Sequence, residues 1–477
     1  MRFKSLLLAG VLGVTSFNAN ALTEITIYNQ DLALLKKSND VYLSSGVNEV
    51  VFDEVARTSK PESVIIFGDN FQVLEQNFDY QGISYTNLLK ANVGKFVKTL
   101  RTGHSEFVNA LLLAVDNGNP ILKFDYGIES KFDGQVVFDE IPLGLNNNPI
   151  LKAKIEAKDS ITSVINLAYM AKGFDWSANY IAQVIDDSKI KLLGRVALNN
   201  NSGSNYEDVS INLVAGEVNT VKEQMPRLVR SLNTAMSDTI TITNENSVMS
   251  KPESLNGFYL YSLPFRTELI NGQVKMVSFV DAKEVSYIKN NILNSPLRFG
   301  PNKTDFKQEH PTMTYTFQNS KEQGLGQPLP EGKVSFYDND KNGNLQFVGE
   351  DQIKNTAINE EITLELGKNF DVFANATIKD VKKLSERKYK KNPTDRCVTV
   401  ENMYLYDVSY EITNSGKYDI NFTLNQPLNN DGIIVQESKK GQATNKDEHQ
   451  WNLSIKAGEK ATLDVCIKAH LDTRDCM

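Results

Sequence analysis

One segment of the chain has the spacing of a calcium-binding loop. Oxygen-bearing side chains stand at alternate positions, Asp338, Asp340 and Asn342, and a turn glycine follows at Gly343. EF-hand loops begin in this way because Ca²⁺ prefers carboxylate and amide oxygens. The twelfth position should be a bidentate glutamate, but Gly349 stands there. The flanks alternate like strands, so an Asn-Gly hairpin is the favoured interpretation. Weak calcium binding is the alternative, and no other cofactor is expected.

A second candidate site is an aromatic and acidic stretch. Trp176, one of two tryptophans, lies beside Asp175 and close to Tyr180. These side chains could form a stacking platform for a sugar or a peptide. Large aromatic residues more often serve burial, so packing in a core or domain interface is favoured, and binding at Asp175, Trp176 and Tyr180 is the alternative.

The sequence shows no catalytic set. The histidines lie in polar, turn-like contexts, and none has the spacing of a zinc pair. They are His104, His310, His449 and His470. The chain has neither a G-x-S-x-G elbow nor a glycine-rich phosphate cradle. The acid pairs Asp186-Asp187 and Glu360-Glu361 are discounted as glycosidase carboxylates, because adjacent strand residues point to opposite faces.

Residues 1–21 have the features of a secretory signal peptide. Arg2 and Lys4 precede an uncharged apolar run that ends at an A-x-A cleavage site, Ala19-Asn20-Ala21. The run is shorter than the roughly 20 residues needed to span a membrane, and no later stretch is apolar enough to do so. Cleavage after Ala21 would remove two basic residues and change the formal net charge from −8 to −10. We expect a periplasmic or secreted, surface-exposed protein that does not bind nucleic acid and has no transmembrane segment after cleavage.

The three cysteines lie near the end of the chain, where export would allow disulfides to persist. Cys397 opens one strand-like run and Cys466 lies inside another, so a bond between them would join two strands. A bond between Cys466 and Cys476 would instead close a short loop. Sequence does not determine the connectivity, and the pairing of Cys397 with Cys466 is favoured. The remaining thiol would be free or intermolecular.

Alternating strands that turn back at an Asn-Ser pair recur three times. The copies run from Ala197 to Leu213, from Tyr315 to Tyr337 and from Tyr410 to Leu424. Each is predicted to be a strand, a polar turn and a returning strand. Their surroundings differ, which favours three independent hairpins over one duplicated unit.

The pattern along the chain predicts an all-β, multidomain protein of β-sandwich, Ig-like modules with a small barrel-like insert. Within the insert only SYTNLLKAN has a helical pattern, and a short helix around Glu223 to Met236 is the alternative to a loop in the linker. The expected sections are an N-terminal β domain at 22–80, the small barrel-like domain at 85–140, the first part of a β-sandwich at 150–219, a linker or mobile loop at 220–256, the second part of that sandwich at 257–380 and a C-terminal Ig-like sandwich at 397–477.

A basic patch, Lys382 to Arg396, precedes the last section. A solvated linker or ribbon turn is the favoured interpretation. Contact with an anionic glycan or lipopolysaccharide is the alternative.

The stretch from Tyr169 to Val218 resembles the bacterial family called domain of unknown function 4139, which is related to a mucoidy-inhibitor-like group. The residues that carry this resemblance are Tyr169, Gly173, Phe174, Trp176, Ala178, Tyr180, Asn201, Ser202, Gly203, Tyr206, Asp208 and Gly216. It continues at Leu263-Pro264, at Gly324 to Ile353 and at Leu364 to Val372. The resemblance implies a secreted or envelope β-sandwich protein and implies no activity.

Two functions remain open at this point. One is a noncatalytic envelope protein whose β modules bind a protein or glycan partner, through an exposed strand edge for example. The other is a hydrolase of envelope polysaccharide or peptidoglycan, whose carboxylates meet only in the fold. A cleft with two carboxylates about 5–10 Å apart beneath an aromatic platform would favour the hydrolase.

Overall fold

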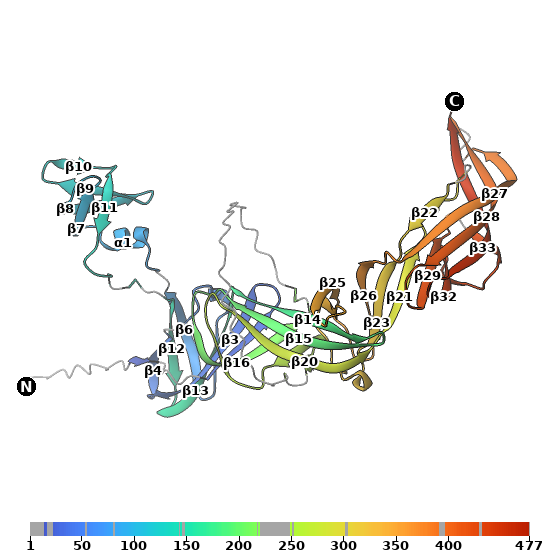
Figure 1. Ribbon diagram of the computed structural model, residues 1–477. Coiled ribbons are helices and arrows are strands. Elements are labelled where there is room, and N and C mark those ends of the chain that lie inside the picture. Colours follow the sequence, from blue (N-terminus) through green and yellow to red (C-terminus); the bar gives the residue numbers. More distant parts are fainter. Residues whose placement is uncertain are drawn as a thin grey trace, which may run out of the picture. The chain divides into compact units, whose positions relative to one another are not determined.

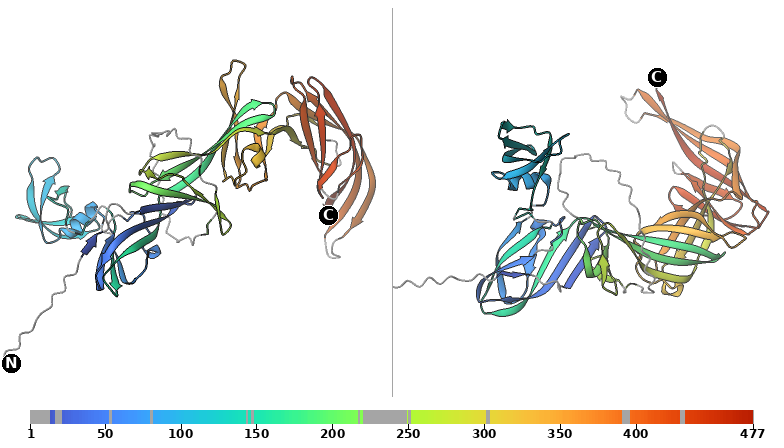
Figure 2. Two further views of the ribbon diagram at one scale, coloured as in Figure 1. Left: turned by 90° about the horizontal axis from the view of Figure 1, so that it is seen from below. Right: turned by 60° about the vertical axis from the view of Figure 1, so that its left-hand side comes forward.

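The computed structural model shows a chain built almost entirely of β-strands (Figures 1 and 2). It describes residues 14–16, 22–52, 55–79, 82–142, 144–145, 148–216, 218–219, 249, 252–300, 304–390, 396–428 and 432–476. The predicted leader and the predicted linker at 220–256 lie mostly outside these residues. The described strands form six separate sheets, which confirms the all-β, multidomain prediction. No helix within these ranges has the length and apolar character needed to cross a membrane.

The chain divides into two compact units. The first comprises residues 1–176, 197–244 and 253–276, and the second comprises 177–196, 245–252 and 277–477.

One sheet of the first unit has the strand order β1-β4-β12-β6. Its strands are β1 (Val14–Ser16), β4 (Gly46–Phe52), β12 (Ile150–Ala157) and β6 (Phe71–Asp79). The described part of the predicted leader, β1, pairs parallel with β4. Alternate residues of β12, such as Leu151, Ala153 and Ile155, are buried, as expected for a strand with one face on a core.

A larger sheet joins the sections at 22–80 and 150–219. Its order is β17-β18-β16-β2-β3-β13-β5, with β19 also paired to β16. The strands are β2 (Leu22–Tyr28), β3 (Leu32–Leu43), β5 (Ile65–Phe67), β13 (Ile161–Ala171), β16 (Tyr206–Ala215), β17 (Glu253–Leu255), β18 (Phe258–Ser262) and β19 (Thr267–Leu269). The 3₁₀ turn η1 (Pro61–Ser63) precedes β5. Because β2 and β16 pair in parallel, residues nearly two hundred positions apart share this sheet.

The insert is an open sheet of order β10-β9-β8-β7-β11, so its described strands do not close into a barrel. The strands are β7 (Phe96–Arg101), β8 (Val108–Asp116), β9 (Asn119–Phe124), β10 (Gly127–Glu129) and β11 (Gly134–Val137). Helix α1 (Tyr85–Ala91) confirms the helical pattern of SYTNLLKAN, and the Ser84 hydroxyl caps it by accepting from the Asn87 amide. Leu89 of this helix packs in one core with Val97 and Leu112.

Three sheets lie mostly in the second unit. Their orders are β20-β15-β14-β24-β25, β26-β23-β21-β29-β32-β31 and β22-β27-β28-β33-β30. The first contains β14 (Phe174–Asp186), β15 (Lys189–Asn200), β20 (Val274–Ser286), β24 (Gly332–Asn339) and β25 (Leu345–Ile353). The second contains β21 (Ile288–Asn294), β23 (Thr312–Gln318), β26 (Glu361–Lys368), β29 (Ile420–Pro427), β31 (Gln442–Asn445) and β32 (Glu448–Ile455). The third contains β22 (Phe306–Glu309), β27 (Val372–Tyr389), β28 (Cys397–Asn414), β30 (Ile433–Glu437) and β33 (Lys460–Cys476). The 3₁₀ turn η2 (Lys321–Gln323) follows β23.

The last two of these sheets enclose a common core and so form a sandwich. Phe422 and Trp451 come from one sheet, Tyr406 and Tyr410 come from the other, and all four side chains are fully buried. The Tyr410 hydroxyl donates to the side-chain oxygen of Gln426 at 2.6 Å, so this polar group is satisfied inside the core.

The predicted basic patch lies on this sandwich. Its described residues are the last part of β27, Lys390, and Arg396 directly before β28, and these two strands pair antiparallel as a ribbon. Residues 391–395 are outside the described part of the chain.

Three buried asparagines make the same set of hydrogen bonds. Asn200 ends β15, Asn319 follows β23, Asn414 ends β28, and each is at most 1% exposed. In every case the side-chain nitrogen donates to two backbone carbonyl oxygens at 3.0 Å or less, and the side-chain oxygen accepts a backbone N–H of its own turn. The carbonyls belong to Ser204 and Leu269 for Asn200, to Gln327 and Ala357 for Asn319, and to Tyr418 and Lys456 for Asn414. The side-chain nitrogen of Asn414 also lies 3.4 Å from a third carbonyl oxygen, that of Ile455.

These asparagines explain the recurring Asn-Ser turns. The second carbonyl of each pair lies just before or within another turn, so one amide joins two turns that are distant in sequence. Each copy is a strand, a turn and a second strand, but its two strands belong to different sheets: β15 and β16, β23 and β24, and β28 and β29 are not neighbours. The prediction of hairpins is therefore wrong, and each turn connects one sheet to another. In the first copy the buried residue is Asn200, and Asn201 is exposed.

The favoured disulfide is wrong. Cys466 carries a free thiol and pairs across the ladder with Asp407, so it is not bonded to Cys397. The residue opposite Cys397 in the β28–β33 ladder is Cys476. The sequence places both Cys397 and Cys466 in strands, but it does not determine their register, and register decides which residues face each other.

Candidate functional site

The predicted aromatic platform is part of the protein core. Trp176 is 2% exposed, and its indole nitrogen donates to the carbonyl oxygen of Val214 at 3.3 Å. Tyr180 is 1% exposed, and its hydroxyl donates to the carbonyl oxygen of Pro330 at 2.7 Å. Neither ring offers a face to a ligand, so the packing interpretation describes both residues.

Asp175 points away from that core on the same strand and is half-buried. Partial burial raises the pKa of its carboxyl group, and the nearby negative charge of Asp31 acts in the same direction. Asp175, Trp176 and Tyr180 do not form one site, because side chains alternate along the strand and the acid lies on the opposite face from the two rings.

The calcium-like motif forms the hairpin turn between β24 and β25. Asp340 accepts the backbone N–H groups of Asn342 and Asn344 at 2.8 and 2.9 Å. These bonds, led by those from Asn344, lower the pKa of the Asp340 carboxyl group. The Asp338 carboxylate accepts the backbone N–H of Asn339. The carboxylates therefore hold the turn, and the described residues contain no group of three or more His, Cys, Asp or Glu side chains that could hold a metal.

Three of the four histidines have partners within the fold. Nδ1 of His310 lies 3.0 and 2.9 Å from the carbonyl oxygens of Asn369 and Val372. Nε2 of His449 lies 3.2 Å from the Glu437 carboxylate, and Nδ1 of His470 lies 3.7 Å from Glu401. His104 is exposed, as expected for a surface histidine.

The discounted acid pairs hold turns. Asp186 accepts the backbone N–H and the hydroxyl of Ser188. Glu360 accepts the backbone N–H of Ala357 at 2.8 Å.

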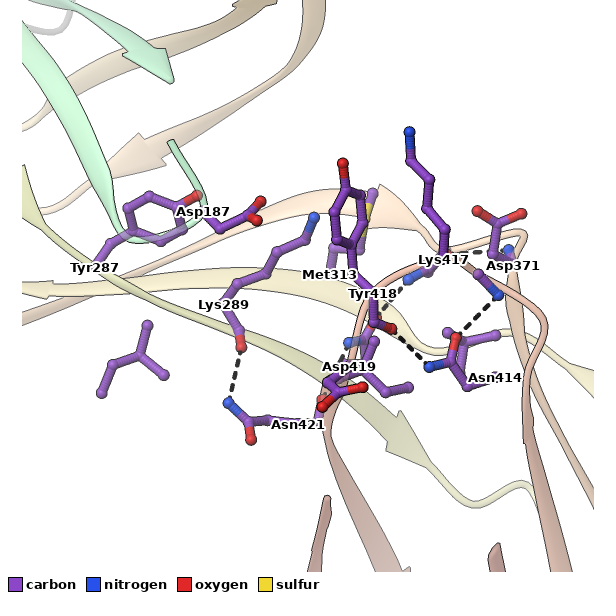
Figure 3. Close-up of a pocket in the computed structure, with 16 residues that line it drawn as sticks. Asp187, Tyr287, Lys289, Met313, Asp371, Asn414, Lys417, Tyr418, Asp419 and Asn421 are labelled. Carbon is purple, nitrogen blue, oxygen red and sulfur yellow. Dashed lines mark hydrogen bonds between the residues drawn. The ribbon is translucent and has the colours of Figure 1, made fainter. Parts of the chain in front are cut away.

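The second unit contains a pocket of about 700 Å³ (Figure 3). Its walls come from the turn after β14, from β21 and β23, from the turn before β27, and from the turn between β28 and β29. The lining residues are Asp187, Tyr287, Ile288, Lys289, Asn291, Met313, Asn369, Asp371, Val372, Asn414, Gly416, Lys417, Tyr418, Asp419, Ile420 and Asn421. This volume is typical of small-molecule sites.

Asparagine amides fix the floor of the pocket. The side-chain nitrogen of Asn369 donates to the side-chain oxygen of Asn291 at 2.8 Å, and Asn291 donates to the carbonyl oxygen of Asn421. The buried Asn414 holds the turn that carries Lys417 and Tyr418. These amides use their hydrogen bonds within the protein, so they position the wall rather than offer binding groups.

The rim carries an exposed aromatic ring and two ammonium groups. Tyr418 is 58% exposed, and the Lys417 ammonium lies 5.1 Å from its ring centre. The Lys289 ammonium lies 5.7 Å from the ring centre of Tyr315, which is stacked on Tyr287. Figure 3 shows Lys289 and Lys417 on either side of Tyr418. Neither lysine makes an ion pair with a described residue.

The carboxylates of the pocket are separated from one another. Asp419 forms an ion pair with Lys456 at 2.7 Å and accepts the backbone N–H of Ala457. In the view of Figure 3, Asp187 lies beyond Lys289 and Asp371 lies beyond Lys417, with Tyr418 between the two lysines. In that view no two labelled carboxylates point toward each other beneath the ring, as the acid pair of a glycosidase would.

A second pocket, of about 790 Å³, lies in the first unit between turns that contain Gly46, Asn70 and Lys158. Its only aromatic lining residue is Phe71, which is half-buried. It presents fewer groups for recognition than the pocket around Tyr418.

Sequence reasoning missed the pocket around Tyr418. Asp187, Lys289 and Lys417 are each separated by more than a hundred residues, and no motif joins them. One signal was present, because the third Asn-Ser turn supplies Gly416, Lys417 and Tyr418.

Comparisons with known proteins gave no relatives. No family model matches the chain, no curated protein is similar to it, and no solved structure matches it.

Proposed function

We propose that this chain is an exported, noncatalytic protein of the bacterial envelope, periplasmic or surface-exposed, that binds a glycan partner through the pocket around Tyr418. The observation that carries the proposal is the lining of this pocket. The exposed ring of Tyr418 and the charged groups of Lys289 and Lys417 line the pocket, and asparagine amides fix its floor. Sugars are bound by such combinations, because the ring packs against C–H groups while charged groups bond to hydroxyls.

The separation of the pocket carboxylates supports binding over hydrolysis. Glycosidases need two acids that flank one bond, with one of them protonated. Here Asp419 is neutralised by Lys456, and two lysines stand between Asp187 and Asp371.

The relationship to the domain of unknown function 4139 is part of the proposal. Several residues that carry the resemblance pack around the turn at Asn200. Gly173 lies against the backbone of Asn201, and Phe174 contacts Tyr206. These contacts support a structural role for the motif, in accord with a family that implies no activity.

The test uses residues 22–477 and envelope polysaccharide that has been freed of protein by protease. We expect the protein to co-sediment with this material and Tyr418→Ala to reduce the bound fraction at least fivefold. Tyr42→Ala is the matched control, since Tyr42 is 57% exposed and lies in the other unit. Equal binding by Tyr418→Ala and the unsubstituted protein would contradict the assignment of the pocket. Release of soluble sugar fragments would contradict a noncatalytic role.

A further inference from the structure

The charged groups of the pocket follow an ordered pattern. Across the view of Figure 3 the order is Asp187, Lys289, Tyr418, Lys417 and Asp371. Two positive charges thus flank the aromatic ring, and a negative charge lies beyond each of them. A pocket for an uncharged sugar would not need two ammonium groups beside its aromatic ring.

The fold fixes the backbone of both lysines at the pocket that contains Tyr418. Lys289 lies on β21, two residues after Tyr287, whose hydroxyl donates to the carbonyl oxygen of Asp186. Its main-chain oxygen lies 3.5 Å from the side-chain nitrogen of Asn421. Lys417 and Tyr418 share the turn that Asn414 closes.

The carboxylates of Asp187 and Asp371 can accept hydrogen bonds from hydroxyl groups of a ligand. No hydrogen bond to the side-chain oxygens of Asp187 or Asp371 is formed by the described residues around the pocket. Carboxylates accept hydrogen bonds from sugar hydroxyls, and their charge would repel an anionic group placed at either end.

We infer that the pocket binds an acidic saccharide, with its carboxylate or phosphate group between Lys289 and Lys417 over the ring of Tyr418, and with hydroxyl groups directed at Asp187 and Asp371. This inference rests on the proposed glycan binding and adds the charge of the ligand. A volume of about 700 Å³ accommodates a short oligosaccharide segment.

Calorimetric titration of residues 22–477 tests the inference with defined probes. The probes are tri-galacturonic acid, its methyl ester, and maltotriose that carries one phosphate group. The ester keeps the shape of the acid and removes its charge. We expect the acid to bind at least tenfold more tightly than the ester, since hydrogen bonds to charged groups are stronger than those between neutral groups. Comparison of the acid with the phosphorylated sugar identifies which anionic group is preferred.

Variants locate the effect. Lys289→Gln and Lys417→Gln should each weaken binding of the acid about tenfold and leave binding of the ester unchanged. Lys283→Gln is the control, because Lys283 is exposed on β20 and does not line the pocket. Asp187→Asn and Asp371→Asn should weaken binding of the acid and of the ester equally, because each substitution removes a carboxylate that accepts hydrogen bonds from the sugar hydroxyls.

Three outcomes would overturn the inference. They are equal affinity for the acid and the ester, absence of binding by every probe, and equally tight binding of a tri-glutamate peptide. The co-sedimentation test with Tyr418→Ala is independent of ligand charge. If Tyr418→Ala loses co-sedimentation while the acid and the ester bind with equal affinity, glycan binding stands and only the acidic character of the ligand is rejected.

Discussion

The side-chain nitrogen of Asn414 lies 3.0 Å from the carbonyl oxygen of Lys456, and this bond joins the turn after β28 to the turn before β33. Asn414 is 1% exposed, so water cannot replace the donor. An aspartate would place a negative oxygen against these carbonyl groups, and an alanine would leave them unpaired. The same reasoning applies to Asn200 and Asn319.

Asn200→Ala should destabilise the first unit. The carbonyl oxygens of Ser204 and Leu269 would lose a donor, and an unpaired buried group costs about 1–3 kcal/mol. We expect a loss of roughly 2–3 kcal/mol on this basis, measured as a lower midpoint in thermal or denaturant unfolding. The neighbouring Asn201→Ala is the matched control, because Asn201 is exposed and should change stability by less than about 0.5 kcal/mol. Similar effects of both substitutions would show that the amide is not the stabilising group.

Gly173→Ala should lower the free energy of unfolding more than an alanine substitution at another glycine of positive φ. Gly173 has φ +87°, and a Cβ there would lie 2.7 Å from backbone atoms of Asn201. Gly46 has φ +97° with open space around it, so Gly46→Ala tests the backbone conformation alone. Left-handed strain costs about 1–3 kcal/mol, and we expect Gly173→Ala to exceed Gly46→Ala by at least about 1 kcal/mol because of the contact. Equal unfolding midpoints for Gly173→Ala and Gly46→Ala would show that the turn at Asn201 shifts to accommodate the added Cβ.

Cys397 and Cys476 should form a disulfide under oxidising conditions. They are opposite residues of an antiparallel ladder, where Cβ atoms approach to about 4.5–5.5 Å, and small adjustments allow a bond. Peptide mapping without reduction should show this link, and Cys466 should be the residue alkylated once the protein is unfolded. Cys397→Ser should lower stability by about 2–4 kcal/mol, whereas Cys466→Ser should have little effect. A mapped bond that contains Cys466 would refute the prediction.

The native thiol of Cys466 should react slowly at neutral pH. Burial raises the pKa of this thiol, and the negative charge of Asp407 acts in the same direction. Alkylation of the folded protein at pH 7 should therefore be slower than that of a free cysteine and should accelerate as pH rises. Asp407→Asn should increase the rate at a fixed pH, and an unchanged rate would exclude a contribution from that charge.

Stability of the sandwich should depend on ionised Glu437. Burial alone would raise the pKa of this carboxyl group, but bonds from the Trp451 indole and the Gly441 amide, together with His449, lower it below its ordinary value of 4.5. Because the folded pKa is the lower one, this stabilisation is complete above pH 4.5 and is lost as pH falls through the folded pKa. Glu437→Gln should therefore lower the unfolding midpoint at pH 7, and the difference from the unsubstituted protein should shrink at pH 3. Glu459→Gln, on an exposed turn, should show no such dependence, and a constant difference for Glu437→Gln would contradict the linkage.

Local patterns in the sequence predicted the strands well. Alternation in Ile150–Ala157 and in Tyr410–Leu424 reflects one buried face, which is a local property. Helix α1 was also visible from the sequence, because Ser84 caps a short helical pattern. Asn319 and Asn414 were identified as turn residues, although their burial and their distant carbonyl partners were not.

Pairing between distant strands could not be read from the sequence. The parallel pairs β14–β24 and β21–β29 join segments more than a hundred residues apart, and a one-residue change of register would exchange their faces. The roles of Trp176 and Cys466 depend on such registers, which is why a ligand platform and a disulfide remained open for them. The pocket depends on them as well, since Asp187, Lys289 and Lys417 meet only after the sheets have formed.

For a chain that is exported, as we propose, the position of β33 would impose an order on folding. This strand lies between β28 and β30, and it pairs with β28 from Cys397 opposite Cys476 to Thr413 opposite Lys460. Until β33 has crossed the membrane, β28 has β27 on one side and no strand on its other side. The rings of Tyr406 and Tyr410 then lack part of their cover. The sandwich, and with it the turn that carries Tyr418, would therefore mature only after the rest of the chain has been translocated.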